Sequence, residues 1–422
     1  MRAVNDRPTG VWVSSSTVPS TSFAPFRHRA YLLVWFGAMV SNVGTWMETT
    51  ALSYYVADTS KASWSGIVAA AGFLPTALLS PIGGAWADRF DRRKIMICTN
   101  SVSAVIAAAV AALVASGDAT PALLALFSLA AGCANAIGFP AFQATLPDLV
   151  PPEELIAAIG LSSTQWNLGR IIGPSAAGIA IWLGGVPAAL WCNAASFLAV
   201  ILAISFARIP LTPRTKRPIV QAIRDGIRFA RQNPAVRSMV PVMFAVTLIG
   251  APFIGFIAQI ATRVFHTKQG GTSLLVTAQG VGAVIAGASM GSLTHRFGLR
   301  RTMNGAAILF GPALVVYGIS PNIIAAAVAL AFTGAAYMAC ISSFSSITQQ
   351  SAPSELRGRA MSVNNFILGF AYPLGLFIEG PLADATSLRA VTVGTGVLLV
   401  AALVLGRLLR PRHTEPIALA LS

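Results

Sequence analysis

Three ionisable side chains, Glu48, Arg170 and Glu379, stand inside long apolar stretches of the sequence. If these stretches cross a membrane, each charge costs about 2.5–3.5 kcal/mol at the bilayer centre on insertion scales. Each side chain must therefore be paired, protonated or exposed to water. A carboxyl group in this setting is suited to proton coupling, because it can change its charge when its surroundings change. We expect Glu48, Arg170 and Glu379 to be proton-coupling residues.

Glu48 is the first candidate for the group that carries the proton, and we expect it to approach Arg170 on a neighbouring segment. A static ion pair between them is the alternative. For Glu379 the alternative is a place near the membrane interface, together with Asp384. Four polar or aromatic residues of the same stretches are candidates for lining a substrate cavity, with plain packing as the alternative for the aromatic one: Asn42, Trp46, Gln143 and Asn167.

The composition identifies the elements that must hold these residues. The chain has 422 residues, of which 55% are hydrophobic and 10% charged, and its mean hydropathy is +0.70. These values indicate a polytopic membrane protein. A helix needs about 20 apolar residues to cross the hydrocarbon. The sequence accordingly predicts an all-α fold with twelve transmembrane helices, at residues 31–56, 64–86, 95–115, 121–142, 155–183, 187–209, 239–265, 273–293, 303–319, 322–347, 361–384 and 391–408.

Two charged loops indicate that the chain is duplicated. The first follows an apolar run and contains Gly84, Asp88, Arg89, Arg92 and Arg93. A similar loop lies 207 positions later and contains the following residues: Gly291, His295, Arg296, Arg300 and Arg301. Gly173-Pro174 and Gly380-Pro381 keep the same offset, as do Gln143 and Gln350. We therefore expect two pseudo-symmetric bundles of six helices.

The hydrophilic segments divide the chain into five parts. We expect a disordered cytoplasmic tail at 1–26, bundles at 27–209 and 238–409, a cytoplasmic linker at 210–237 and a second tail at 410–422. Apolar residues recur near helical spacing in the linker, which predicts an amphipathic helix on the membrane surface. A solvated linker helix is the alternative.

The positions of Lys and Arg predict the orientation. Twenty-four of the 29 fall on the side of the termini and of the two charged loops, whereas only Lys61, Arg263, Lys268 and Arg389 fall on the other. Both termini should therefore be cytoplasmic in a cell (inner) membrane. This distribution also explains the net charge of +15 as an orientation signal and a contact surface for anionic lipids. Nucleic acid is not an expected partner.

These features together resemble the major facilitator superfamily. Its loop between spans 2 and 3 has the pattern Gly-x-x-x-Asp-Arg-x-x-Arg-Arg, which Gly84, Asp88, Arg89, Arg92 and Arg93 fit. Asp91 stands where a second Gly is usual, and His295 replaces the acid in the later copy. The resemblance implies that Asp88 accepts hydrogen bonds from the N-terminal amides of span 11 and holds the cytoplasmic side shut in one state of a transport cycle.

Span 5 is similar to the antiporter signature of that superfamily. Gly160, Gly169, Gly173, Pro174 and Gly178 fit the pattern Gly-x8-Gly-x3-Gly-Pro-x2-Gly-Gly, except that Ala177 replaces one closing Gly. Small residues let helix backbones approach closely, and Pro174 bends the helix. Close packing without a transport role is the alternative.

Further stretches resemble the branch of siderophore exporters and macrolide efflux proteins: residues 143–150, 167–174 and 355–359. The resemblance implies proton-coupled export of an amphipathic small molecule, such as a drug or a siderophore, by a protein that functions as a monomer. Span 4 lacks the Arg that many proton-coupled drug antiporters carry, so their proton pathway does not transfer directly.

Other functions remain as alternatives. A proton-driven importer or facilitator of a nutrient would differ in the direction of flux, and a membrane sensor would bind a ligand without transporting it. The sequence argues against an enzyme, because its four His residues form no metal-binding motif and no phosphate-binding Gly-x4-Gly-Lys-Ser/Thr loop occurs. No metal and no cofactor is expected.

Overall fold

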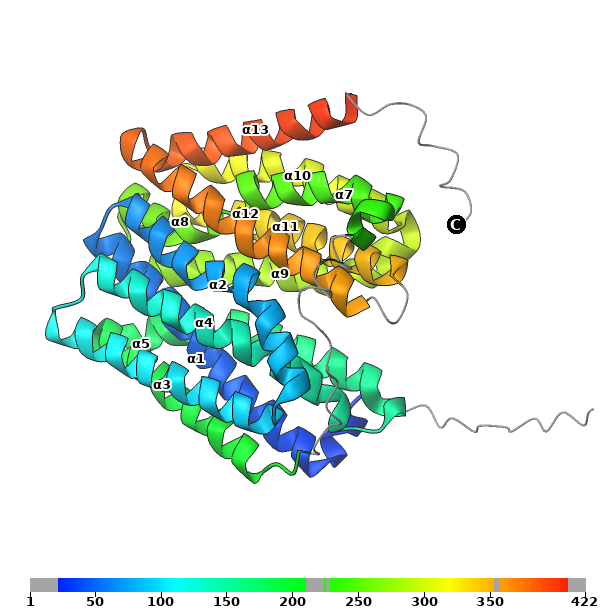
Figure 1. Cartoon of the computed structure of the whole chain (residues 1–422). Helices are drawn as coiled ribbons and strands as arrows, with labels where there is room; N and C mark the ends of the chain where they lie inside the picture. Colours follow the sequence, from blue (N-terminus) through cyan, green and yellow to red (C-terminus); the bar gives the residue numbers. More distant parts are fainter. Residues whose placement is uncertain (1–21, 210–223, 225–227, 353–356, 409–422) are drawn as a thin grey trace, which may run out of the picture.

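The computed structural model describes residues 22–209, 224, 228–352 and 357–408. The predicted first tail lies largely outside these residues, as do most of the linker, the second tail and part of the 355–359 stretch. The described chain folds into two groups of helices that lie side by side, one built from α1 to α5 and the other from α7 to α13 (Figure 1).

The first group contains five helices and three short 3-10 turns. The 3-10 turns lie at Ala24–Arg27, Leu146–Asp148 and Pro152–Glu154. The helices are α1 (Arg29–Thr59), α2 (Ala62–Arg89), α3 (Arg92–Ser116), α4 (Pro121–Thr145) and α5 (Leu155–Phe206). Gly184 and Gly185 have non-helical backbone angles inside α5, and the φ of Gly185 is +74°. This break divides α5 into two membrane-length helices, at the place where the sequence predicts the end of one span and the start of the next.

The second group begins with a helix that contains two π-helical turns. It consists of α7 (Pro234–Ala245), a π-helical turn (Val246–Gly250), α8 (Phe253–Gln259) and a second π-helical turn (Ile260–Val264). The remaining helices are α9 (Gln269–Phe297), α10 (Leu299–Ile319), α11 (Ile323–Ser351), α12 (Arg357–Ala385) and α13 (Leu388–Leu408). We expect the π-helical turns to make the backbone easier to deform next to the contact with the first group.

Ten helical segments in the described part of the chain are long and apolar enough to cross a membrane. One of them contains both halves of α5, and α1 is a further helix of 31 residues that is less apolar. A helix of that length reaches across the hydrocarbon. The predicted all-α membrane fold is confirmed. Counting the two halves of α5 separately and adding α1 would give twelve spans, a number that stays a prediction.

The ends of the helices define two faces of the bundle. We call the face with the turn between α1 and α2 the α1–α2 face, and the opposite face, with the turn between α2 and α3, the α2–α3 face. Local signals fix several ends: the side chain of Asp91 caps α3 by accepting from the Arg93 amide at 2.9 Å, and Gly117 ends α3 with φ +83°.

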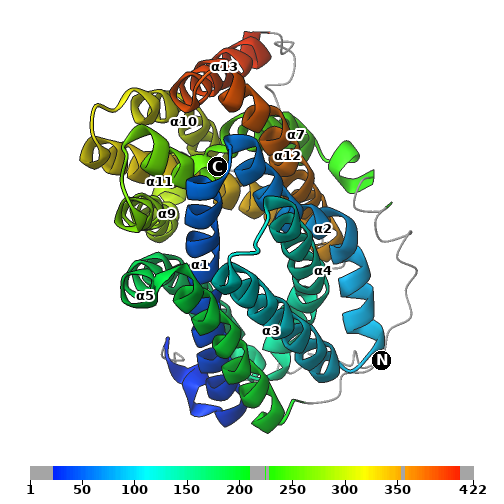
Figure 2. The ribbon, with the colours of Figure 1, turned by 90° about the vertical axis from the view of Figure 1, so that its left-hand side faces the viewer.

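The two groups contact each other mainly through α2 with α12 and α5 with α9 (Figures 1 and 2). Near the α1–α2 face the backbones nearly touch: a Cβ on Gly66 would lie 2.8 Å from the carbonyl of Leu376, and one on Gly380 would lie 2.9 Å from the Cα of Ser63. At the other end of α2, a Cβ on Gly84 would meet nothing within 4 Å. The close packing between α2 and α12 thus extends from the α1–α2 face past the middle of α2, where a Cβ on Gly369 would lie 2.7 Å from the Ala77 amide nitrogen, and is absent at Gly84.

The contact between α5 and α9 follows the same gradient. A Cβ on Gly178, near the α1–α2 face, would lie 2.9 Å from Oγ of Ser273, and one on Gly280 would lie 3.2 Å from the carbonyl of Arg170. Gly160 and Gly287, closer to the α2–α3 face, have open space in these positions. The described parts of the two groups are therefore joined more tightly toward the α1–α2 face than toward the α2–α3 face.

The glycines of α5 also set its packing against α1. A Cβ on Gly169 would lie 2.5 Å from Nδ2 of Asn42, and one on Gly173 would lie 2.4 Å from Cβ of Trp46 and 3.0 Å from the carbonyl of Val43. Because α1 and α5 lie in the same group, these two glycines allow close packing within that group, and the transport role of the motif stays a prediction.

Two glycines of this motif, Gly173 in a tight contact and Gly160 in open space, allow a test of this packing with a matched control. We expect Gly173→Ala to lower the free energy of unfolding by about 1–3 kcal/mol, because α1 must move to admit the methyl group. Gly160→Ala should not destabilise the protein, since its methyl group enters open space and alanine favours a helix. Thermal unfolding of the two purified variants tests this. Equal melting temperatures would contradict the tight α1–α5 contact.

Candidate functional site

Glu48 lies on α1, where it faces the second half of α5. Its Oε2 accepts a hydrogen bond from Nδ2 of Asn193, a residue with no exposed surface. Ser196 donates to the other amide atom, Oδ1 of Asn193, at 3.3 Å. The carboxyl group is thus held by a neutral amide that is itself oriented by a hydroxyl group.

Arg170 lies on α5 and reaches the other group of helices. Its guanidinium Nη2 donates to Oε1 of Gln279 on α9 at 2.9 Å, and it lies 5.6 Å from the centre of the Trp46 ring. Arg170 is 8% exposed and Gln279 is 3% exposed. A cation buried at the contact between the two groups is therefore held by an amide and an aromatic face, while its Nε has no hydrogen-bond partner among the described residues.

The expected approach of Glu48 to Arg170 is not what the structure shows. The two form no ion pair or hydrogen bond, and each has a neutral partner instead. The side chain of Glu48 turns from α1 toward Asn193, whereas Arg170 points across to α9. Both the direct coupling and the static pair between them are wrong for this state of the protein.

Glu379 lies on α12 and is only 5% exposed. Within the described part of the chain it makes no hydrogen bond or ion pair. Glu379 lies near the α1–α2 face, as its neighbour Gly380 does, but it is buried whereas Asp384 is exposed. The alternative expected for it, a place at the interface beside Asp384, stays open. A buried carboxyl group without a partner is expensive when charged, so Glu379 stays a candidate for proton coupling.

The four expected cavity residues lie in different surroundings. Asn42 is buried and donates to the carbonyl groups of Gln165 and Trp166 at 3.2 and 3.3 Å, so it joins α1 to α5. Asn167 donates to the Ser163 carbonyl of its own helix at 2.8 Å. Gln143 is exposed near the end of α4.

Trp46 belongs to an aromatic cluster that it forms with Trp166 and Phe139. Its ring centre is 6.3 Å from that of Trp166, which is 6.2 Å from that of Phe139. Phe139 and Trp166 are 42% and 47% exposed. Three helices, α1, α4 and α5, thus present aromatic surface next to Arg170, a surface suited to an apolar or amphipathic ligand.

The first charged loop is bound firmly to its own group. Arg92 donates to Oδ2 of Asp148 and to the Ala144 carbonyl, both at 2.6 Å, and Arg93 donates to the Ser205 carbonyl. Asp88 and Arg89 are exposed at the end of α2. Asp88 forms no hydrogen bond with any described residue. Residues 353–356, directly before α12, lie outside the described part of the chain, so the contact with span 11 that the resemblance implies stays a prediction.

The second charged loop is looser. His295, Arg296, Arg300 and Arg301 are all exposed around Gly298, which connects α9 to α10 with φ +77°. Arg296 lies 5.3 Å from the ring centre of the adjacent Phe297. Within the described residues, no ion pair holds this loop in place as Arg92 holds the first one.

The partners of the charged residues were not predicted from the sequence. Asn193 and Gln279 are neutral amides within apolar runs, where an expectation of opposite charges overlooks them. Asp148 was visible as an acid that follows α4, and a buried arginine in a loop needs an acid or several carbonyl groups. That requirement could have led to the Arg92–Asp148 pair.

Comparison with known proteins yields one family and several relatives. A family model described as transmembrane secretion effector, belonging to the major facilitators, matches residues 20–421. The multidrug efflux pump Tap of Mycolicibacterium fortuitum is 29% identical over 373 residues, covering 85% of this chain and 90% of that protein. The enterobactin exporter EntS of Salmonella typhi is 26% identical over 411 residues, covering 93% and 96%.

A solved structure has the same fold. It is a bacterial homologue of the human lysosomal transporter Spinster in an inward-facing, unoccupied conformation, with a TM-score of 0.72 at 17% identity. The match covers 91% of this chain and 97% of that one.

The Arg92–Asp148 pair gives a prediction about the first loop. We expect Arg92→Gln to lower the free energy of unfolding by about 1–3 kcal/mol, because Asp148 loses a charged partner that is only partly exposed. Arg89→Gln removes the same charge from an exposed neighbour and should have almost no effect. Thermal unfolding in detergent measures both. A loss of stability in Arg89→Gln as large as in Arg92→Gln would contradict the assignment.

Proposed function

The chain belongs to the major facilitator superfamily, among the transmembrane secretion effectors, and on that premise we propose that it exports an amphipathic small molecule in exchange for protons. It is a multi-pass transporter of the cell membrane whose relatives are exporters. Their printed substrates, drugs and the siderophore enterobactin, suggest the class that this protein carries. Transport, and no chemical conversion, is the activity that we assign to it.

The hydrogen bond between Glu48 and the neutral amide of Asn193 is the observation that supports proton coupling most directly. This amide can donate to a carboxylate and can also accept from a protonated carboxyl group. An arginine in that place would stabilise only the charged form. A neutral partner therefore lets the side chain hold or release a proton as access to water changes.

We further propose that the α2–α3 face is cytoplasmic, as are both termini. The excess of Lys and Arg at this face supports that orientation. The tight packing at the α1–α2 face then corresponds to a state closed to the outside, and the looser contact at Gly84 and Gly160 to a state that opens inward. Protons and bilayer lipids are the other partners in this proposal, and a monomer is the functional unit.

The bundles would rock around a midplane site between them. Arg170 and the aromatic cluster of Trp46, Trp166 and Phe139 lie beside the contact of α5 with α9, where this motion changes the surroundings most. The aromatic surface fits an apolar part of the substrate, and Arg170 fits a polar or anionic part. Glu379 is the second candidate for a proton site.

A transport assay tests the function. In cells without their own pumps, the wild-type protein should lower the accumulation of fluorescent drugs or a labelled siderophore, and a protonophore should abolish the effect. Glu48→Gln should lose at least about nine-tenths of the export, because the amide cannot exchange a proton. Glu153→Gln, an exposed acid outside the spans, is the matched control and should export normally.

Two other outcomes would decide against this proposal. Higher accumulation in cells with the wild-type protein would indicate an importer. Export that persists in Glu48→Gln and in the presence of the protonophore would remove the proton coupling.

The role that the resemblance gives to Asp88 predicts a second defect. We expect Asp88→Asn to reduce export several-fold, because the neutral side chain caps a helix N-terminus more weakly in the state closed to the cytoplasm. Insertion should stay normal, since Asp88 is exposed and bonds to no described residue in the present state. Export assays at equal membrane levels measure this. Normal export would contradict the gating role.

A further inference from the structure

The turn between α1 and α2 is bound at its second half by an acid from the other group of helices. Asp384, near the end of α12, accepts hydrogen bonds with both carboxylate oxygens, from the Ala62 amide at 2.8 Å and from the Ser63 amide at 3.0 Å. These amides are the first two of α2, which have no partner within their own helix. A carboxylate in this position also interacts favourably with the positive end of the helix dipole.

The first half of the same turn is bound by a cation and an amide. Arg263 donates to the carbonyl groups of Ser60 and Ala57, at 2.5 and 3.5 Å, at the end of α1. Gln259, one turn before Arg263 and fully buried, donates to the Ser60 carbonyl at 3.0 Å and to Oγ of Ser65 at 2.9 Å. A cation thus meets the negative end of α1, as the acid meets the positive end of α2.

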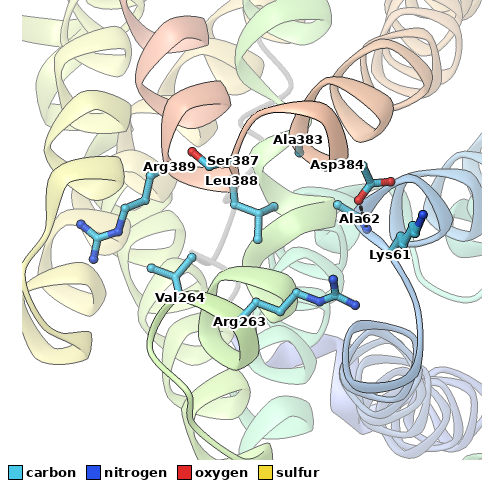
Figure 3. A pocket seen from close by; sticks show the side chains of 9 residues that line it. All are labelled: Lys61, Ala62, Arg263, Val264, Ala383, Asp384, Ser387, Leu388 and Arg389. Carbon is cyan, nitrogen blue, oxygen red and sulfur yellow. Dashed lines mark hydrogen bonds between the residues drawn. The ribbon is translucent and has the colours of Figure 1, made fainter.

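Asp384, Arg263 and Ala62 line a cavity of about 380 Å³ at the α1–α2 face. Figure 3 shows Asp384 beside Ala62, with Arg263 extending toward the same turn from the opposite wall. Arg389 lines the cavity as well, but its guanidinium lies 5.6 Å from the ring centre of Phe265, and it makes no hydrogen bond with the α1–α2 turn. Of the two arginines that line the cavity, one therefore bonds to the other group and one does not, while Lys61, the third cation of the lining, belongs to the α1–α2 turn itself.

We propose that Asp384 and Arg263 form a two-point latch that holds the α1–α2 face closed, and that this latch must release once in every transport cycle. Each residue belongs to the second group of helices and binds a helix end of the first. The four hydrogen bonds described above go to backbone atoms, so the latch depends on the position of the helix ends. The Ser63 side chain and the charge of Lys61, both of the turn, also stabilise the carboxylate of Asp384.

The latch has no counterpart in the other half of the duplicated sequence. At the offset of 207 residues, Ala177 stands opposite Asp384 and Val56 opposite Arg263. The contact of α5 with α9 near this face has only the weaker pair of hydroxyl groups of Ser175 and Thr277, 3.3 Å apart. The latch is therefore asymmetric: it acts at the α1–α2 turn, and the related part of the pseudo-symmetric structure has no equivalent residues.

The latch also complements the proposed role of Asp88, and in this respect it rests on the function proposed above. Asp88 ends α2 and Asp384 lies near the end of α12, two helices that run antiparallel and pack together. In the present state Asp384 caps the N-terminus of α2, while Asp88 is exposed. Each acid would cap its partner helix in one of the two states, so that one latch forms as the other breaks.

Distances between spin labels test the latch without any transport. Asp118→Cys and Pro321→Cys place labels in exposed turns of the two groups at the α1–α2 face. The background replaces Cys98, Cys133 and Cys192, which are exposed or partly exposed, and keeps the buried Cys340. Double electron–electron resonance on the purified protein in lipid nanodiscs then gives the populations with a short and a long distance between the labels.

The wild-type protein should show mainly the short distance. Asp384→Ala and Arg263→Gln should each raise the ratio of long to short distances about five-fold or more, as expected for the loss of a helix cap. Asp384→Asn keeps the size and one acceptor and should give a smaller shift. Arg389→Gln, which removes the same charge as Arg263→Gln from the same cavity, should leave the distances unchanged.

The outcomes separate the latch from the transport function. Distances in Asp384→Ala, Asp384→Asn and Arg263→Gln identical to those of the wild type would overturn the latch, even if export is proton-driven. An equal shift in Arg389→Gln would also overturn it, because the effect would then follow from the charge of the cavity alone. The predicted shifts, in a protein that transports no compound, would retain the latch and reject the exporter.

Discussion

The two halves of this protein must pack closely enough to exclude water and must still separate during transport. The contact of α2 with α12 has to satisfy both requirements. Glycines at positions 66, 369 and 380 bring the backbones to distances at which no side chain fits. In a membrane such contacts gain van der Waals energy without needing charged partners. They weaken steeply when the helices tilt apart, since each depends on a separation of a few ångströms.

Polar bonds between the halves are few among the described residues, and each has a location that suits a moving contact. Arg170 with Gln279 joins α5 to α9 deep in the bundle, while Gln259, Arg263 and Asp384 bind the α1–α2 turn. A neutral acceptor for Arg170 costs less to separate than an ion pair would, because no second charge is left unpaired. The structure can thus bury a cation at the contact and still allow it to open.

The fold followed from the sequence far better than the contacts of individual residues did. Long apolar runs, the repeated loop and the distribution of Lys and Arg predicted the membrane helices, because burial in lipid constrains every residue of a span in the same way. The break of α5 at Gly184 and Gly185 also fell between the two predicted spans. α1 is harder to recognise by hydropathy, since it carries Glu48, Asn42 and several hydroxyl residues.

Side-chain partners were predictable only where chemistry left a single choice. Opposite charges predicted a pair of Glu48 with Arg170, but helix rotation decides which residues meet, and it directs Glu48 to Asn193. Asp384 and Arg263 were each noted, one as an interface acid and one as an exception to the distribution of cations. Their common target is the backbone of the α1–α2 turn, and backbone acceptors and donors leave no trace in a sequence pattern.

Exchange of a substrate for protons is the central claim, and proton movement in proteoliposomes tests it most directly. Purified protein is reconstituted with a pH-sensitive dye inside, no pH gradient is imposed, and a substrate found by screening is added outside. The account predicts that the interior becomes more alkaline as the substrate enters, in wild type but not in Glu48→Gln. Substrate entry without a pH change, or with acidification, would contradict antiport.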